Sequence, residues 1–335
     1  MHMSDALITP VVGGSMMAAS SGVMGYSIRS LKKEIFEKRL PLMGVMGAFL
    51  FAAQMINFAI PGTGSSGHIG GGILLAIVLG PAASFLTMAC VLLIQALFFA
   101  DGGLLAYGCN LINLGFFSAF VAYPLIFKPI VKNNLNRKTI MVASIAASVI
   151  GLQLGSLGVV FETIVSGRTE IPLSAFLIFM QFIHLAIGVA EGVVTGVIIN
   201  YLYSQNKQMI FMKIEEPKES RKWNKNIILK IAVLTIIIAG ILSLFASVKP
   251  DGLEWAIQKT AVVKEQSNDS TIATWLDTVQ KKTAIFPEYE LKAEESKIAV
   301  GTSIPGIVGS IVTLCVTLVV GGVIRKRRKH AELYE

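Results

Sequence analysis

Charged side chains are scarce in this sequence of 335 residues, where Asp, Glu, Lys and Arg make up 15% and the mean hydropathy is +0.67. Water-soluble globular chains carry about 25% charged residues, so that class of protein is excluded. Cysteine is rare as well. Cys90, Cys109 and Cys315 all lie inside apolar runs, which argues against a disulfide framework or a thiolate metal site.

Sequence signatures of enzymes are also missing. The chain has no H-E-x-x-H pattern, no nucleophile elbow and no Walker A loop. The run Gly62-Thr-Gly-Ser-Ser-Gly67 matches G-x-G-x-x-G by letter, but no strand precedes it and an apolar segment follows. We therefore expect neither catalysis nor a catalytic cofactor, and any ATP hydrolysis would be performed by separate proteins.

The sequence is rich in uncharged apolar runs long enough to cross about 30 Å of hydrocarbon as helices. They predict an all-α polytopic membrane protein with about seven helices in an N-terminal bundle and two C-terminal transmembrane helices. One of the seven is short, because Gly80-Pro81 breaks the run 69–99 and proline removes a backbone donor. Spans are expected at about 10–28, 41–60, 69–79, 82–99, 108–127, 139–161, 172–203, 227–247 and 304–324.

The distribution of cations predicts the topology. Of the 29 Lys and Arg residues, 20 fall in four segments that nine crossings place on one side, namely 29–39, 128–138, 205–226 and 325–335. The positive-inside rule assigns that side to the cytoplasm, so the N-terminus lies outside and the C-terminus inside. A net charge of +8 arranged in this way indicates a multi-pass protein in contact with membrane lipid and no nucleic acid.

Composition divides the chain into three parts. We expect an N-terminal transmembrane unit over 1–204, a polar cytoplasmic linker over 205–226 and a two-helix unit over 227–335. The external segment of the last unit, 248–303, contains no histidine or cysteine, and short helices around 253–262 and 271–283 are expected there. No basic region precedes the first span, so we expect no cleaved signal peptide and a chain that begins at Met1.

A metal site is suggested by two histidines on the external face. His2 precedes the first span and His68 closes the glycine-rich loop. The Met1 amine, the His2 backbone nitrogen and His2 Nδ1 can close two chelate rings, and His68 can fill a fourth corner. Four nitrogens in a square plane suit Ni(II), Cu(II) or low-spin Co(II) better than Zn(II). Many proteins begin with Met-His, so an unremarkable surface histidine is the alternative.

Other polar groups in apolar sequence have two interpretations. His184 and Glu191 share one helix face and form either a structural polar pair or support for the site. Asn110 and Asn113 have the same two interpretations, with structural hydrogen bonding favoured, and Ser66 in the loop is a further supporting candidate.

Small residues recur at helical spacing in the first two spans. The rows are Gly14, Ala18 and Gly22 in the first and Gly44, Ala48 and Ala52 in the second. Such rows allow close helix packing, either inside the bundle or against another membrane subunit.

Several motifs together resemble one family. They are Met1-His-Met-Ser-Asp, Gly-Thr-Gly-Ser-Ser-Gly-His-Ile-Gly-Gly-Gly (62–72), Leu79-Gly-Pro, Gln95-Ala-Leu-Phe-Phe-Ala-Asp-Gly-Gly and Gly108-Cys-Asn-Leu-Ile-Asn. This pattern resembles the NikM/CbiM substrate-binding (S) components of energy-coupling-factor (ECF) transporters over about 1–204. The run Lys-Pro-Asp-Gly-Leu-Glu-Trp (249–255) is similar to the signature of the small NikN/CbiN partner, here in the same chain.

The resemblance implies an ATP-dependent importer of Ni²⁺ or Co²⁺ in a bacterial or archaeal cell membrane. It implies metal ligands at Met1, His2 and His68, and a transmembrane coupling (T) subunit and cytosolic ABC-type ATPases as partners. By the same resemblance, the coupling-subunit contact falls on Gly44, Ala48 and Ala52. The fused architecture favours nickel slightly over cobalt.

Two other functions stay open at this point. A self-sufficient secondary carrier or channel should carry a row of polar residues through its spans, and only His184, Glu191 and a few amides qualify. A membrane scaffold without a ligand would leave the placement of His2 and His68 without a reason.

Overall fold

The computed structural model describes residues 2–31, 33–168, 171–205, 225–260, 270–289 and 302–331, without the side chains of 33–38, 225 and 327–331. The regular secondary structure of the described residues is helical apart from one short antiparallel hairpin of β1 (Phe58–Ala59) and β2 (Ser66–Gly67). The all-α prediction is therefore confirmed. The N-terminal helices are η1 (Asp5–Leu7), α1 (Pro10–Ser30), α2 (Lys33–Gln54), α3 (Gly72–Leu79), α4 (Pro81–Phe99), α5 (Tyr107–Asn110), η2 (Leu111–Phe127), α6 (Lys128–Lys132), α7 (Arg137–Ser166) and α8 (Leu173–Gln205).

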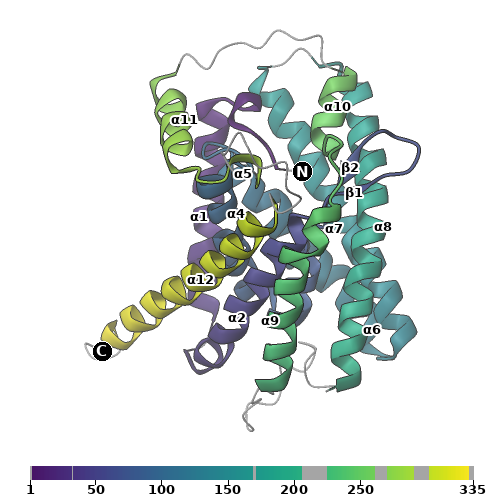
Figure 1. Cartoon of the computed structure of the whole chain (residues 1–335), viewed down its shortest axis with the longest axis vertical. Coiled ribbons are helices and arrows are strands. Elements are labelled where there is room, and N and C mark those ends of the chain that lie inside the picture. Colours follow the sequence, from purple (N-terminus) through teal and green to yellow (C-terminus); the bar gives the residue numbers. More distant parts are fainter. Residues whose placement is uncertain are drawn as a thin grey trace.

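The C-terminal part packs onto this bundle. Its helices are α9 (Lys225–Gly240), η4 (Leu242–Phe245), α10 (Gly252–Thr260), α11 (Thr271–Thr283), η5 (Pro287–Tyr289) and α12 (Ser303–Ala331). Helices α9 and α12 lie against α2, while α10 contacts α8 and α11 contacts α4. The two short helices expected in the external segment are thus present as α10 and α11. They lie at one end of the molecule, and α6 and the C-terminal end of α12 lie at the opposite end (Figure 1).

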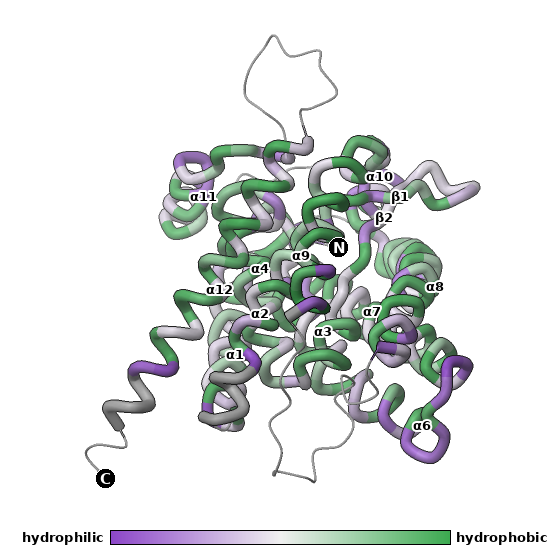
Figure 2. Tube along the Cα trace, turned by 60° about the horizontal axis from the view of Figure 1, so that its bottom comes forward, coloured by the Kyte–Doolittle hydropathy of each residue, from purple (hydrophilic) through white to green (hydrophobic). Residues whose placement is uncertain are grey.

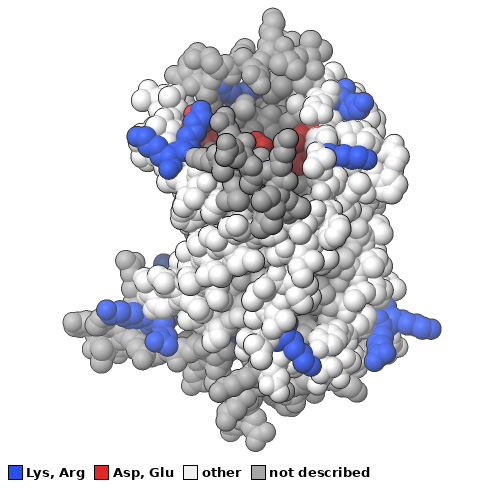
Figure 3. Space-filling model, viewed as in Figure 1, with Lys and Arg blue, Asp and Glu red and all other residues white. Residues whose placement is uncertain are grey.

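Six helices of the described chain are long and apolar enough to cross a membrane, and the apolar part of α2, Arg39–Gln54, is shorter. The six are Pro81–Phe99, Tyr107–Lys132, Arg137–Ser166, Leu173–Gln205, Asn226–Phe245 and Ser303–Lys326. Large apolar side chains such as Phe161 and Ile178 are 68% and 65% exposed, as lipid contact requires. Hydrophobic residues predominate along the helices in Figure 2. On the face shown in Figure 3, the Lys and Arg side chains gather near the two ends of the molecule, with an uncharged zone between them.

The predicted break at Gly80-Pro81 is confirmed. Gly80 joins α3 to α4 with φ 82° and ψ 162°, a conformation essentially restricted to glycine. Every residue of α3 is buried, and its last carbonyl, that of Leu79, accepts a hydrogen bond of 2.6 Å from Nη1 of Arg39. With eight residues, α3 is about 12 Å long and is too short to cross the bilayer alone.

An extended glycine-containing segment precedes α3 inside the bundle. The N–H of Gly70 donates to Oε2 of Glu191 at 2.6 Å, and the Gly70 carbonyl accepts from Nε2 of Gln54 at 2.9 Å. Gln95 donates in turn to Oε1 of Gln54 at 3.0 Å. Non-helical backbone at this depth needs such partners, because hydrocarbon offers none. The segment can therefore carry His68 at its start without leaving the Gly70 backbone unsatisfied.

Candidate functional site

His2 and His68 meet at the end of the bundle that carries the β hairpin. Their rings stack with centroids 4.9 Å apart and planes inclined by 11°. The His2 side chain is 4% exposed and His68 is 8% exposed. Two of the four histidines, far apart in the chain, are thus buried side by side, as their predicted placement on one face requires.

The hydrogen bonds of the rings decide which nitrogens can bind an ion. His68 Nδ1 lies 3.1 Å from the carbonyl oxygen of Ile69 and donates to it, so Nε2 carries the lone pair. His2 Nδ1 lies 3.1 Å from Oδ1 of Asp101. His2 Nε2 is buried and has no hydrogen-bond partner among the described residues. Since the planes are nearly parallel, the lone pairs do not converge, and one ring must turn for both to bind one ion.

The electrostatics keep the loop histidine, His68, in the form that can bind a metal ion. Burial lowers the pKa of His68 from 6.5 to about 3, so its ring is neutral at physiological pH. Removal from solvent would raise the pKa of Asp101, but the charge of His2 and its hydrogen bond outweigh this and hold that pKa well below its usual range. A neutral imidazole and an ionised carboxylate therefore lie next to His2.

Asp101 was not among the predicted site residues. Its Oδ2 also accepts a hydrogen bond of 2.5 Å from the hydroxyl of Tyr289. The run Phe-Ala-Asp-Gly-Gly contains this aspartate and carried the family resemblance, so its signal was present in the sequence. Nothing local indicated that this carboxylate would face His2.

Asn110 holds the backbone next to His2. Its Oδ1 accepts from the N–H of Met3 at 2.7 Å, and its Nδ2 donates to the Met3 carbonyl at 3.1 Å. The N–H of Gly103 donates to the same carbonyl at 2.8 Å. Asn113, one turn further along, donates to Oε2 of Glu162 at 2.7 Å. Of the two asparagines, Asn110 is thus the one bonded to the backbone of the N-terminal segment.

The other supporting candidates bind different groups. Ser66 Oγ donates to the carbonyl of Lys249 at 2.7 Å, next to the loop histidine. Glu191 supports the Gly70 backbone, whereas Nδ1 of His184 bonds to the Met180 carbonyl of its own helix at 2.7 Å. His184 and Glu191 therefore serve separate partners instead of forming the polar pair that their spacing allowed.

The predicted coupling row on α2 is covered by this chain. A Cβ on Gly44 would come within 2.9 Å of Leu314 in α12, and Ala48 and Ala52 are 7% and 0% exposed. Gly44 thus packs against the chain's own C-terminal helix, and all three residues are buried within this chain, so they do not present the surface that a separate subunit would contact. The row on α1 differs. Gly14, Ala18 and Gly22 are exposed, and a Cβ built on either glycine would meet no other described part of the chain within 4 Å beyond the helix's own backbone.

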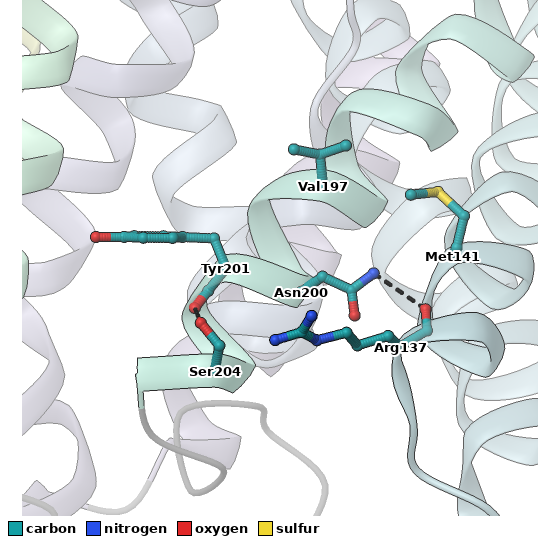
Figure 4. A pocket seen from close by; sticks show the side chains of 6 residues that line it. All are labelled: Arg137, Met141, Val197, Asn200, Tyr201 and Ser204. Carbon is teal, nitrogen blue, oxygen red and sulfur yellow. Dashed lines mark hydrogen bonds between the residues drawn. The ribbon is translucent and has the colours of Figure 1, made fainter.

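A cavity of about 320 Å³ lies at the other end of α7 and α8, far from His2. Figure 4 shows its lining residues, which are Arg137, Met141, Val197, Asn200, Tyr201 and Ser204. Among the described residues, no three His, Cys, Asp or Glu side chains cluster at metal-ligand spacing. Met1, the predicted third contributor, lies outside the described residues.

Comparison with known proteins gives matches for both parts of the chain. Residues 2–209 match the family model CbiM, described as a cobalt uptake substrate-specific transmembrane region, and residues 225–326 match the PDGLE domain. A protein of Archaeoglobus fulgidus, provisionally named fused nickel transport protein NikMN, is 32% identical over 314 residues, which cover 94% of this chain and 96% of that protein.

Two further matches each cover about six-tenths of this chain. A fused nickel transport protein NikMN of Rhodobacter capsulatus is 30% identical over 223 residues, which cover 63% of this chain and 64% of that protein. A crystal structure of a truncated transition metal transporter superimposes with a TM-score of 0.53 at 30% identity, covering 61% of this chain and 99% of the other.

Proposed function

Because the chain belongs to the CbiM family of substrate-specific transmembrane regions, with a PDGLE domain fused behind it, we propose that it captures Ni²⁺ or Co²⁺ outside the cell for an ATP-dependent importer. It is a membrane protein of nickel and cobalt transport and not an enzyme. The metal ion is its cargo. Nickel is favoured, since fused relatives carry nickel in their names.

The ligands in this proposal are nitrogens. His68 contributes Nε2, His2 contributes its backbone nitrogen and imidazole, and the Met1 amine completes the set. The observation that carries the proposal is the burial of His2 and His68 ring against ring beside Asn110, which fixes the backbone of Met3. A set of four planar nitrogens selects Ni²⁺ or low-spin Co²⁺ against Zn²⁺ and against the hard ion Mg²⁺.

The arrangement of the bundle supports an external site. The site lies at the end that carries α10 and α11, whereas the predicted cytoplasmic clusters lie around α6 and the end of α12 (Figure 1). With the N-terminus outside, the ion enters from the external face, and lipid surrounds the apolar flanks of α7 and α8.

Transport then needs partners that reorient this subunit. We assign that role to a transmembrane coupling subunit and cytosolic ABC-type ATPases of the ECF type. The exposed row Gly14, Ala18 and Gly22 on α1 is the better candidate for the coupling contact, because the α2 row lies under α12.

The proposal is tested by moving a purification tag. A chain with an N-terminal extension should purify without nickel, because the extension converts the amine into an amide that no longer coordinates. A C-terminal tag should leave the nickel content intact, and His68→Ala with the C-terminal tag should lose it. Metal content is measured by atomic emission after purification. Equal nickel in the two tagged forms would refute the proposed ligand set, and uptake without ATPase partners would indicate a secondary carrier instead.

A further inference from the structure

The C-terminal unit contacts the segment that bears His68 and the segment of Asp101 and Gly102 that lies beside His2. Next to His68, the N–H of Ser66 donates to the carbonyl of Pro250 at 2.8 Å, which continues the β hairpin by one more strand-like contact. Near His2, Nε2 of Gln280 on α11 donates to the carbonyl of Gly102 at 2.7 Å. The unit therefore packs on each of the two segments that bring the imidazoles together.

A further contact of the C-terminal unit links Tyr289 to the His2 imidazole through the carboxylate of Asp101. The Tyr289 hydroxyl donates to Oδ2 of Asp101 at 2.5 Å, and the other oxygen, Oδ1, lies 3.1 Å from Nδ1 of His2. The two oxygens of one carboxylate thus face a group of the C-terminal unit and a group of the metal site. A change at the hydroxyl alters which way the carboxylate points.

The Tyr289 ring is held firmly in this place. It stacks on Phe99 at the end of α4, with centroids 4.9 Å apart and planes inclined by 24°. The N–H of Phe286 donates to the Phe98 carbonyl at 3.0 Å. Glu288 and Tyr289 adopt φ angles of 54° and 62°. Residues other than glycine rarely adopt this left-handed conformation, and it persists only where surrounding contacts impose it.

We propose that Tyr289 is a positioning residue of the metal site, which sets the availability of the His2 imidazole by fixing the carboxylate of Asp101. This inference rests on the proposed function. His2 Nδ1 cannot face Asp101 and close a chelate ring at the same time. The carboxylate and the ion therefore compete for one nitrogen, and Tyr289 holds the carboxylate in the rotamer that engages it.

The direction of the effect follows from this competition. Tyr289→Phe keeps the stacking on Phe99 and the negative charge of Asp101 but frees the carboxylate to rotate. His2 Nδ1 is then released more often, and nickel should load faster. One net hydrogen bond sets the scale, so the loading rate should rise roughly 3- to 10-fold.

The experiment uses the full chain with a C-terminal tag, mixed in a stopped-flow instrument with nickel on a chromophoric chelator. Transfer of nickel is followed at the chelator band, and the ligand-field band of bound nickel reports the coordination. The same pair of measurements is made for Tyr289→Phe in the wild-type and in the Asp101→Asn background. The rate increase should appear in the first and vanish in the second, because the influence passes through Asp101.

Two control variants separate positioning from docking. Tyr203→Phe removes a hydroxyl that donates to Leu135 at the other end of the bundle, and it should load as the wild type does. Gln280→Leu weakens the docking of α11 without touching Asp101, and it should not reproduce the faster loading. The inference would be overturned if Tyr289→Phe had no effect, or if its effect persisted in the Asp101→Asn background. In either case, nickel binding by the wild type would leave the proposed function standing. A wild-type chain that takes up no nickel would overturn both.

Discussion

Replacing Asn110 by alanine should weaken nickel binding although Asn110 touches no metal. Its side-chain amide makes two hydrogen bonds with Met3, one at 2.7 Å to the N–H and one at 3.1 Å to the carbonyl. Both fix the backbone directly after His2. Without them the N-terminal segment loses its register against α5, and part of the binding free energy must then be used to order it.

The magnitude follows from the two bonds. Each contributes about 0.5–1.5 kcal/mol net, so together they contribute about 1–3 kcal/mol to the ordering of this segment. Since about 1.4 kcal/mol corresponds to a factor of ten, the nickel dissociation constant should rise roughly 5- to 150-fold. Competition with a chelator of known affinity measures this constant on the C-terminally tagged protein.

Asn113→Ala is the matched control, because Asn113 lies three residues further along and donates to Glu162 at 2.7 Å. It reaches Met3 through the side-chain sulfur, at 3.9 Å, so its loss leaves both hydrogen bonds between Asn110 and the Met3 backbone in place. It should lower the unfolding temperature by leaving a buried carboxylate oxygen without that donor, yet keep nickel affinity within about twofold of the wild type. If Asn110→Ala bound nickel as tightly as Asn113→Ala, the argument that the Met3 backbone positions His2 would be refuted.

Two further predictions concern the fold and the pH dependence. Gly80→Ala should destabilise the protein by about 1–3 kcal/mol because alanine disfavours φ near 82°, and an unchanged thermal unfolding in detergent would contradict this. Nickel affinity should fall as the pH drops from about 8 to about 6, because a terminal amine and a backbone amide must lose protons to bind. His68 adds little to that fall in affinity, because its pKa of about 3 keeps the ring neutral in the folded protein. The free energy of unfolding should instead decline as the pH falls from 6.5 towards 3, because in this range His68 takes up a proton in the unfolded chain and not in the folded one.

The sequence was most informative where local chemistry decides the structure. A glycine followed by proline disfavours continuation of a helix through its own backbone, so the division of the run 69–99 at Gly80-Pro81 was predictable. The placement of His2 and His68 at one face followed from charge clusters and helix lengths, which are also local properties summed along the chain. These features required no knowledge of packing.

Contacts between distant segments were not predictable in this way. The small-residue spacing of Gly44, Ala48 and Ala52 is the same for a helix of the same chain and for another subunit, so it could not reveal α12 as the neighbour. Likewise, a tyrosine in a polar external segment carries no sign that its hydroxyl meets Asp101. Such partners depend on how two units dock, and hydropathy does not encode docking.

The extended residues after His68 and the buried helix α3 form one continuous strut along α2. It is tied at Gly70 to Gln54 and at Leu79 to Arg39, positions about four turns or roughly 22 Å apart on α2. Tilting the whole bundle leaves both ties and the spacing of the two imidazoles unchanged. Axial slip of the strut, by contrast, would have to break both hydrogen bonds together, and it would change the distance between His68 and His2.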